Sequence, residues 1–574
     1  MKKFVKVGLV LAVSALVLTS CDCFKKLSKK ADTVAVSCTP SILSLKGDNV
    51  TATYTVEFPA KYFVKNAVVK ITPVLKYEGG EIAGTPKFLQ GEKVKDNYQV
   101  ISYQNGGSMS QTVTFPYKPE AKRSVLELKV EAKCCKDCNA KPKEFVALPQ
   151  NVVVAEGIST IQLLADDFAQ LAYAKDEYKR ITTETNEANI MFQINRANVR
   201  PDQLSSEQVK ALQNFIIENS DQPRRTLSDL YTKAYASPDG PLAFNDKLSQ
   251  QRGENTHSAL VKKFKKDKMP VEPKFDVDAL GEDWEGFKEL VAASNIPEKD
   301  VILQILQMYS DPEKRDQEIK NMTSVFNVLA EEILPELRRS KLIMNVDIEG
   351  LSDEEIVAAI NNDVNSLKLE ELLYGATLVE DNATKAKVYT AATKKFPDCW
   401  RAWNNLGVVL AKEGQVNEAK SAIAKAAQLN SSAPEVANNL GVIALFEGNK
   451  AEAKKYFSAI DTPEAKYNMG LVNLAEGNYE AAVKVLKGYN LAVAEVCNGN
   501  IVNAKNILSR MDDAKANYLK ALIAAKEGNQ SGVVSNLEAA ISEDPSYAEQ
   551  AINEVEFAPY LTVEEFMAVV KIKK

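Results

Sequence analysis

Cysteine is the residue of this sequence best suited to nucleophilic, redox or metal-binding chemistry, because the sequence contains almost no histidine. The chain of 574 residues contains eight cysteines and one histidine, His257, which we interpret as structural. Histidine is the commonest general base and metal ligand, so most hydrolase and metalloenzyme designs are disfavoured. The sequence also has no P-loop, GxGxxG, GxSxG or HExxH pattern. An enzyme built on this chain would depend on carboxylates or on a thiol.

The densest group of thiols is Cys134, Cys135 and Cys138, with Cys38 upstream in the same region. A metal site would normally add a second CxxC or histidines, so we expect no metal and no cofactor. Disulfide pairing is the favoured interpretation if the compartment is oxidising, although the sequence leaves the partners open. Free thiols, a metal site and a thiol-exchange enzyme stay as alternatives.

The N-terminus has the order of charged and apolar residues found in bacterial export signals. Lysines at positions 2, 3 and 6 precede an uncharged apolar run over 7–18, which is shorter than the roughly 20 residues of a membrane span. The Leu-Thr-Ser-Cys that ends at Cys21 resembles the lipobox of bacterial lipoproteins. This resemblance implies a signal peptide over 1–20 and diacylglycerol on the Cys21 thiol. An ordinary secretory signal is the alternative.

The lipoprotein resemblance also implies a place in the cell. The chain is expected in a Gram-negative envelope, anchored by several acyl chains and facing the periplasm. Asp22, directly after the anchor, is an inner-membrane retention residue in enteric-type sorting. Other bacterial lineages ignore this residue, and the resemblance of a later region to an OmpA-like domain favours the outer membrane. The polar, lysine-rich residues 21–33 are expected to be a tether between the lipid and the first folded domain.

Residues 34–155 alternate apolar and polar side chains. Tyr54, Val56 and Phe58 alternate with polar neighbours, as do Leu126 and Leu128, and glycine pairs at 79–80 and 106–107 separate such runs. This period of two is typical of half-buried strands joined by turns. We therefore predict an N-terminal β-sandwich.

A mixed region follows over 156–350. The helical period is expected to begin around Asp166 and is followed by strands near 187–194 and 226–236 and by helices near 202–217 and 241–264. The string from Ala234 to Phe264 resembles the centre of the OmpA-like domain, whose pattern is GYTDxxG, then an asparagine, then LSxxRA. Tyr235, Gly240 and Asn245 match this pattern without gaps, and so do Leu248, Ser249 and Arg252.

Members of the OmpA-like family bind the diaminopimelate of peptidoglycan through an aspartate and an arginine. The resemblance therefore implies a site around Arg252, which matches the family's arginine, together with Asn245, Ser237 and Asp239. Ser237 occupies the family's aspartate position, and the nearby carboxylate is Asp239, directly before the glycine. Peptidoglycan binding is consequently one expectation, and an inherited fold without the ligand is the other. A final strand near 340–348 arrives late, which predicts a helical insertion over about 265–338.

Residues 351–574 repeat with a helical signature. The first complete unit contains Leu406, Gly407, Gly414 and Ala419, and each has a counterpart 34 residues later, namely Leu440, Gly441, Gly448 and Ala453. This is the period of the tetratricopeptide repeat, which the pattern resembles. The resemblance implies a solenoid of helical hairpins whose groove binds a protein or peptide partner. Asn405, Asn439 and Asn468 recur before the small residues, and we expect them to hydrogen-bond between helices.

These features define an expected multidomain α+β chain with a β-sandwich, an OmpA-like domain carrying a helical insertion, and a C-terminal α-solenoid. Its net charge of −6 disfavours nucleic acid as a partner. The expected function is that of a lipid-anchored envelope scaffold that binds proteins, possesses no catalytic activity and contacts peptidoglycan if the OmpA-like site is intact. An accessory subunit of a secretion or surface-fibre assembly is the alternative.

Overall fold

The computed structural model describes residues 22–134, 145–166, 169–269 and 273–571. The signal peptide and Cys21 therefore lie outside the described residues. The chain forms two compact units, one made of 1–174 with 397–574 and one made of 175–396. We name them the split unit and the inserted unit, since the second interrupts the first in sequence.

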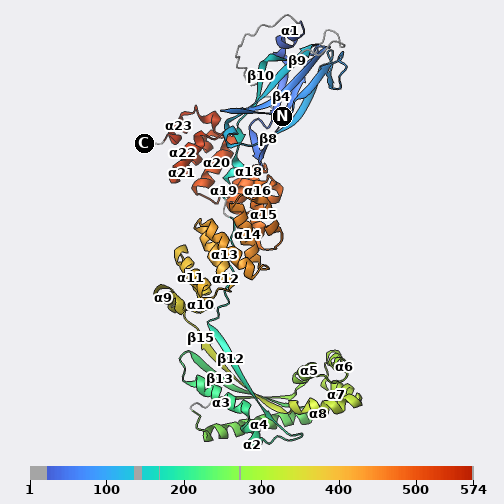
Figure 1. The fold of residues 1–574 in the computed structure, drawn as a ribbon, viewed down its shortest axis with the longest axis vertical. Helices are drawn as coiled ribbons and strands as arrows, with labels where there is room; N and C mark the ends of the chain where they lie inside the picture. The colour runs from blue at the N-terminus through green and yellow to red at the C-terminus, as the bar shows by residue number, and fades with distance from the viewer. Residues whose placement is uncertain (1–21, 135–144, 167–168, 270–272, 572–574) are drawn as a thin grey trace. The chain divides into compact units, whose positions relative to one another are not determined.

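The N-terminal part of the split unit consists of two sheets (Figure 1, blue and cyan). One has the order β1-β3-β2-β11, with β8 also paired to β3, and the other has the order β10-β9-β4-β6-β7, with β5 paired to β4. The strands are β1 (Ala35–Thr39), β2 (Leu43–Lys46), β3 (Asn49–Phe58), β4 (Ala67–Tyr77), β5 (Gly80–Ala83), β6 (Lys87–Gly91), β7 (Gln99–Ile101), β8 (Gly107–Pro116), β9 (Val125–Cys134), β10 (Val146–Glu156) and β11 (Ile158–Ser159).

The two sheets enclose one hydrophobic core. Tyr54 and Val56 of β3, Ile71 of β4 and Leu126 and Leu128 of β9 are all buried in it. The alternation along β3 arises because successive side chains of a strand point to opposite faces. The prediction of β-sheets in the N-terminal part of the chain is thereby confirmed.

The segment expected to be a tether is folded. Residues 22–29 form α1 (Asp22–Lys29), which places Leu27 fully inside the sandwich core. A disulfide joins Cys23 to Cys134 at the end of β9. The sequence favoured a disulfide in this region but did not include Cys23 among the partners. Cys38 is a half-buried free thiol, and Cys135 and Cys138 lie outside the described residues.

The C-terminal part of the split unit is helical (Figure 1, orange to red). Its hairpins are α12 (Trp400–Lys412) with α13 (Val416–Leu429), α14 (Pro434–Phe446) with α15 (Lys450–Ser458), α16 (Pro463–Ala475) with α17 (Tyr479–Ala482), α18 (Gly488–Cys497) with α19 (Ile501–Leu508), and α20 (Ala514–Glu527) with α21 (Gln530–Glu543). The last helices are α22 (Ser546–Ile552) and α23 (Glu564–Val570). Within the described residues, no helix is both long and apolar enough to cross a membrane.

The glycines and alanines of the repeat signature lie at close contacts and at helix ends. A Cβ atom added to Gly441 would approach the ring of Phe457 on α15 to 2.5 Å, so the hairpin closes only over glycine. Ala419 and Ala453 are fully buried in the hydrophobic clusters of their hairpins. Gly414 and Gly448 have φ of +74° and +76°, the left-handed conformation that ends a helix.

The inserted unit contains a four-stranded sheet with the order β12-β15-β13-β14. Its strands are β12 (Ile181–Met191), β13 (Arg225–Ala236), β14 (Phe275–Glu282) and β15 (Arg339–Glu349). Helices α3 (Glu207–Ser220) and α4 (Leu242–Lys266) pack on the sheet, and α2 (Pro201–Leu204) precedes them. The hydroxyl of Ser206 accepts the amide N–H of Val209 and so caps α3, which begins five residues after the helix start expected near 202.

The predicted insertion begins later than expected. Residues 275–282, inside the proposed range of 265–338, form β14, which pairs in parallel with β13 at the sheet edge. The helices that follow are α5 (Trp284–Ala293), α6 (Lys299–Met308), α7 (Pro312–Asn321) and α8 (Thr323–Glu332), and they share a hydrophobic cluster of their own. The chain then returns to the sheet through β15, near the final strand that the sequence indicated.

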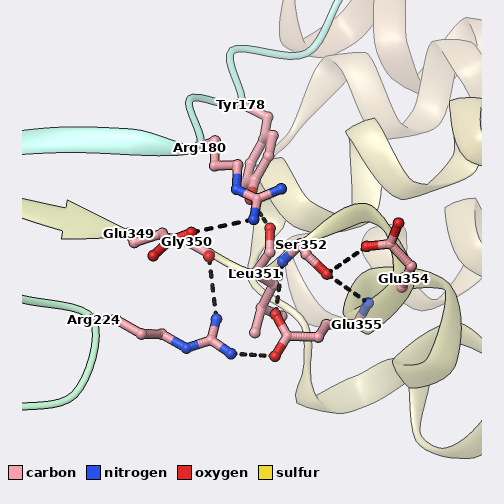
Figure 2. A network of polar contacts seen from close by, with 9 residues as sticks. All are labelled: Tyr178, Arg180, Arg224, Glu349, Gly350, Leu351, Ser352, Glu354 and Glu355. Carbon is pink, nitrogen blue, oxygen red and sulfur yellow. Dashed lines mark hydrogen bonds and ion pairs between the residues drawn. The ribbon is translucent and has the colours of Figure 1, made fainter.

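A polar network joins this sheet to the helices that complete the inserted unit (Figure 2). The guanidinium of Arg224 donates to the carbonyl of Gly350 at 3.1 Å and pairs with Glu355. Tyr178 Oη donates to the carbonyl of Leu351, and Ser352 and Glu355 form a capping box at the start of α9. The helices are α9 (Asp353–Asn362), α10 (Leu369–Leu378) and α11 (Asn382–Lys395).

Candidate functional site

The helical hairpins of the split unit hold a segment of the same chain. After β11, residues 161–164 form a short 3₁₀ turn, and the described residues from Asp166 to Ala174 have no helix or strand of their own. The helical period expected from Asp166 is therefore wrong. Leu171 packs against the hydrophobic clusters of two hairpins, which keeps this extended segment against the first helices of the hairpins.

Four asparagines hold the main chain of this segment. In each case the side-chain carbonyl accepts the backbone N–H of one residue, and the side-chain amide donates to the carbonyl of the same residue. The accepted bonds measure 2.6–2.8 Å and the donated bonds 2.8–3.2 Å. The pairs are Asn405 with Ala174, Asn439 with Ala172, Asn468 with Gln170, and Asn490 with Asp166.

The carboxamide suits this task because it carries one donor side and one acceptor side, as a peptide unit does. The first three asparagines come from α12, α14 and α16, and the residues they hold are spaced by two. One hairpin of the solenoid thus corresponds to two residues of extended chain. These contacts recognise main-chain atoms and make no demand on side-chain identity beyond size.

A second row of asparagines supports the first. Asn404 and Asn438 also donate to the segment, at the carbonyls of Ala172 and Gln170. Asn439 donates to Asn404 at 2.9 Å, which is a bond between helices of the kind the sequence predicted. The larger role of these asparagines, the clamping of an extended segment, was not predicted from the sequence. An Asn-Asn pair that recurs after 34 residues, at 404–405 and 438–439, is the signal that pointed to it.

Small side chains let the segment sit deep in the groove. Ala172 and Ala174 are 9% and 4% exposed, and each is held by an asparagine at its own backbone. The intervening Tyr173 lies with its ring 4.7 Å from the ammonium of Lys412, and burial raises the pKa of its hydroxyl. At the other end of the segment, the carboxylate of Asp166 pairs with Lys515 of α20.

The sandwich is joined to the last repeats by buried polar groups. The hydroxyl of Ser159 hydrogen-bonds to Glu556, and Lys122 pairs with Glu554 at 3.1 Å. Both glutamates are less than 7% exposed. Burial, together with the neighbouring Glu556, raises the pKa of Glu554 to about 7. These contacts hold the sandwich residues that precede the groove segment, and the asparagines hold the segment itself.

The residues of the sequence-predicted OmpA-like site come together in the inserted unit. Ser237 donates to the carboxylate of Asp239 at 2.7 Å, and Asn245 donates to the carbonyls of Ser237 and Gly240. The guanidinium of Arg338 lies 3.3 Å from the same carboxylate of Asp239. Asp239 is thus paired with Arg338, which lies directly before β15 and was not among the predicted site residues.

Arg252 is turned inward. It is 1% exposed, and its guanidinium donates to the backbone carbonyls of Arg196, Tyr235 and Gln193 at 2.8–3.3 Å. Its charge also lies over the ring of Phe192. Burial and the nearby Arg338 lower the pKa of Arg252 to about 10, which leaves it protonated at neutral pH.

A hollow of about 300 Å³ opens beside this loop. Asp239, Glu282 and Asp316 line it together with Lys320, so its walls are mainly acidic. Glu282 accepts hydrogen bonds from Asn245 and Trp284. Arg252 does not reach this hollow. Within the described residues, no group of histidine, cysteine, aspartate and glutamate side chains is arranged to hold a metal ion.

Comparison with known families agrees with the helical hairpins. The tetratricopeptide repeat family matches residues 386–427, which extend from within α11 to within α13. The C-terminal region therefore contains tetratricopeptide repeats, a class of repeat that binds proteins and peptides. No curated protein matches the sequence significantly.

Solved structures resemble only part of the chain. The APC/C hetero-tetramer Cut9–Hcn1 is 17% identical over 37% of this chain and 44% of its own, with a TM-score of 0.29. A tetratricopeptide repeat protein from Parabacteroides merdae is 15% identical over 34% of this chain and 88% of its own, with a TM-score of 0.28. PilW, a type IV pilus biogenesis factor, is 20% identical over 36% of this chain and 99% of its own, with a TM-score of 0.27. At these identities and scores the likeness does not extend to function.

Proposed function

We propose that this chain is a lipid-anchored, periplasm-facing adaptor of the bacterial envelope, without catalytic activity, whose repeat groove binds an extended peptide. The observation that carries the proposal is the row of asparagines along the groove. Each asparagine satisfies both main-chain groups of one residue, so the groove is built for extended backbone. Asn404 and Asn438 reinforce this row.

Asp166 and residues 169–174 of the chain itself occupy the groove, so a partner peptide must displace them. Displacement is feasible because the clamp recognises main-chain atoms, which any extended peptide with small residues at alternate positions can offer. In the resting protein the segment closes the groove and ties the sandwich to the repeats. Exchange for a partner segment would then couple partner binding to the arrangement of the split unit.

The fold of the inserted unit supports an OmpA-like domain without its usual ligand. Its strand, turn and helix occur where the resemblance implied them, at β13 and α4. The two charges of the implied site are engaged within the protein, since Asp239 pairs with Arg338 and Arg252 donates to backbone carbonyls. We therefore favour a domain retained as a scaffold over one that binds peptidoglycan.

The proposal that the groove binds a partner peptide can be tested by a substitution that weakens binding of the chain's own segment in the groove. Ala172→Leu places a larger, branched side chain at a buried alanine, so the segment should leave the groove more often. The full-length variant, recovered from envelopes after cross-linking, should capture more of a defined protein partner than the parent does. Adding Asn439→Ala and Asn468→Ala should abolish that gain, because the groove then lacks the amides that hold a peptide.

Two outcomes would contradict the proposal. Equal capture by the parent, the alanine-to-leucine variant and the triple variant would show that partners bind elsewhere or not at all. Tight sedimentation of the full chain with peptidoglycan sacculi, lost in Asp239→Ala, would show that the OmpA-like site is functional. The identity of the captured protein would separate a general scaffold from a subunit of a secretion or surface-fibre assembly.

A further inference from the structure

A basic hollow lies where α1 meets the sandwich. Its volume is about 900 Å³, and seven of its thirteen lining residues are lysines. Lys26 and Lys29 come from α1, Lys61 and Lys65 from the segment between β3 and β4, and Lys95 from the segment between β6 and β7. Three stretches distant in sequence thus place positive charge around one opening.

Basic residues outnumber acidic ones in the lining of the hollow. Glu92 is the only acidic residue among its described lining residues. Its carboxylate accepts hydrogen bonds from the hydroxyl of Ser102 and the backbone of Tyr103, and it lies 3.6 Å from Lys65. These contacts lower the pKa of Glu92, with the hydroxyl of Ser102 contributing most, so it carries one negative charge against seven positive ones.

The floor of the hollow is fixed. Tyr62 is 7% exposed, and its hydroxyl donates to the carbonyl of Leu27 at 3.0 Å. Leu27 is itself in the sandwich core, and the disulfide between Cys23 and Cys134 holds the start of α1. The lysines of α1 are therefore held beside the loop lysines and do not belong to a free tail.

This position relates the hollow to the proposed anchor. Cys21 is bonded directly to Asp22, so their Cα atoms are about 3.8 Å apart. Lys26 follows Asp22 by four residues of helix, a rise of about 6 Å. Acyl chains on Cys21 would consequently bring a bilayer surface to the end of the sandwich that carries the lysines.

We propose that this basic hollow binds the phosphate groups of anionic lipids in the membrane that holds the anchor. The chemistry is that of several ammonium groups around phosphates, and the inference rests on the proposed lipid anchor only for the choice of lipid over soluble phosphate. Basic groups beside a lipid anchor add to membrane affinity and set an orientation at the surface. The sandwich would then stand on the membrane in a defined orientation.

The test uses the full chain beginning at Asp22, prepared without lipid, so that the hollow is measured apart from the anchor. Sedimentation is compared with vesicles of phosphatidylcholine alone and with vesicles of equal parts phosphatidylglycerol and phosphatidylcholine. We expect binding to the second only, and weaker binding as salt rises, because exposed charges are screened. Inorganic phosphate, added at increasing concentration, is expected to compete poorly.

Charge-reversal variants test whether the vesicles bind at the basic hollow. Lys61→Glu with Lys95→Glu removes two exposed lysines of the hollow, and vesicle binding should fall by about tenfold or more. The matched control is Lys118→Glu with Lys455→Glu, which changes the net charge equally at exposed lysines of the split unit outside the hollow. The control should bind as the parent does.

Several results would overturn the proposal. Equal sedimentation with both vesicle types, or an equal loss in the control, would show that the hollow is not a lipid site. Displacement by low concentrations of inorganic phosphate would assign the hollow to a soluble anion. The anchor is judged separately by lipid labelling of the full-length chain, so vesicle binding without labelling would remove the anchor and keep the hollow.

Discussion

The inward orientation of Arg252 makes it a stability residue. Arg252→Ala would remove the donors of three backbone carbonyls inside the inserted unit, at a cost of about 3–5 kcal/mol in the free energy of unfolding. Arg252→Lys should recover only part, because one ammonium cannot reproduce the planar guanidinium fork. Urea unfolding of the full chain measures both. The control is Arg196→Ala, which removes an exposed side chain of the neighbouring loop. An unchanged midpoint for Arg252→Ala would show that these hydrogen bonds contribute little to stability.

The buried glutamate between sandwich and repeats predicts a pH dependence. The pKa of Glu554 is raised in the folded chain to about 7, so folding favours its protonated form. Stability from this group is complete below its ordinary pKa and is lost as pH rises through 7. The split unit should be about 1–3 kcal/mol more stable near pH 5 than near pH 8 on account of Glu554.

Glu554→Gln isolates this effect, because glutamine keeps the shape and the hydrogen-bonding capacity without the charge. The variant should be more stable than the parent at the higher pH, with a flatter profile between the two. Thermal unfolding followed across that range measures the difference. Parallel pH profiles for parent and variant would show that another group is responsible.

At the scale of elements, the groove segment depends on its asparagine clamps. Asn439→Ala leaves the N–H and carbonyl of Ala172 with fewer partners in a buried place, so we expect a loss of about 2–4 kcal/mol. Asn506→Ala, an exposed position on α19, is the control and should change stability little. Hydrogen exchange at residues 169–174 should quicken in the first variant only. Unchanged protection there would show that the clamp contributes little.

The close approach of α14 and α15 predicts that a substitution on one helix can compensate for a substitution on the other. Gly441→Ala adds a Cβ that meets the ring of Phe457, and overpacking of this kind costs about 1–3 kcal/mol. Phe457→Leu creates space, so the double variant should lose less than the sum of the two single variants. A double-mutant cycle of unfolding free energies measures this coupling. Additive losses would mean that the two residues do not constrain one another.

The sequence predicted elements well where one pattern dominated. The repeats, β13, α4 and β15 carry strong periodicity or a family motif, and each lies close to its expected position. The extended groove segment was predicted as helix because its hydrogen bonds come from residues more than two hundred positions away, which no local pattern encodes. The small residues Ala172 and Ala174 alternate with the large residues Leu171 and Tyr173. This alternation is the local sequence pattern that indicates an extended segment in the groove.

The missed edge strand has a similar explanation. β14 pairs with one strand only, and its Phe275, Val277 and Ala279 form a short alternation beside acidic residues. A single-edge strand needs little apolar surface, so its sequence resembles a loop. The pairing of Asp239 with Arg338 was also beyond prediction, since the two residues are 99 positions apart.

At the scale of the whole molecule, the anchor prediction concerns Cys21. Cys21→Ser should abolish lipid labelling and release the protein into the soluble fraction, because the thiol that accepts diacylglycerol is removed. Fractionation of labelled cells after a high-salt wash measures both effects. A matched variant, Cys38→Ser, alters a thiol of the sandwich outside the lipobox and should leave labelling intact. Labelling that survives in Cys21→Ser would refute the lipoprotein interpretation.

The asparagine clamp on Asp166, Gln170, Ala172 and Ala174 imposes an order of events when the chain is made. Ala174 leaves the ribosome 231 residues before Asn405, its holder. At about 5–20 residues per second, the segment waits on the order of tens of seconds for its groove. The inserted unit is continuous and can fold during that interval, whereas the split unit cannot be completed from the N-terminus onward. The split unit, which carries the proposed anchor, is therefore the last to complete its folding. A folded split unit thus requires that the C-terminal repeats have already been synthesised.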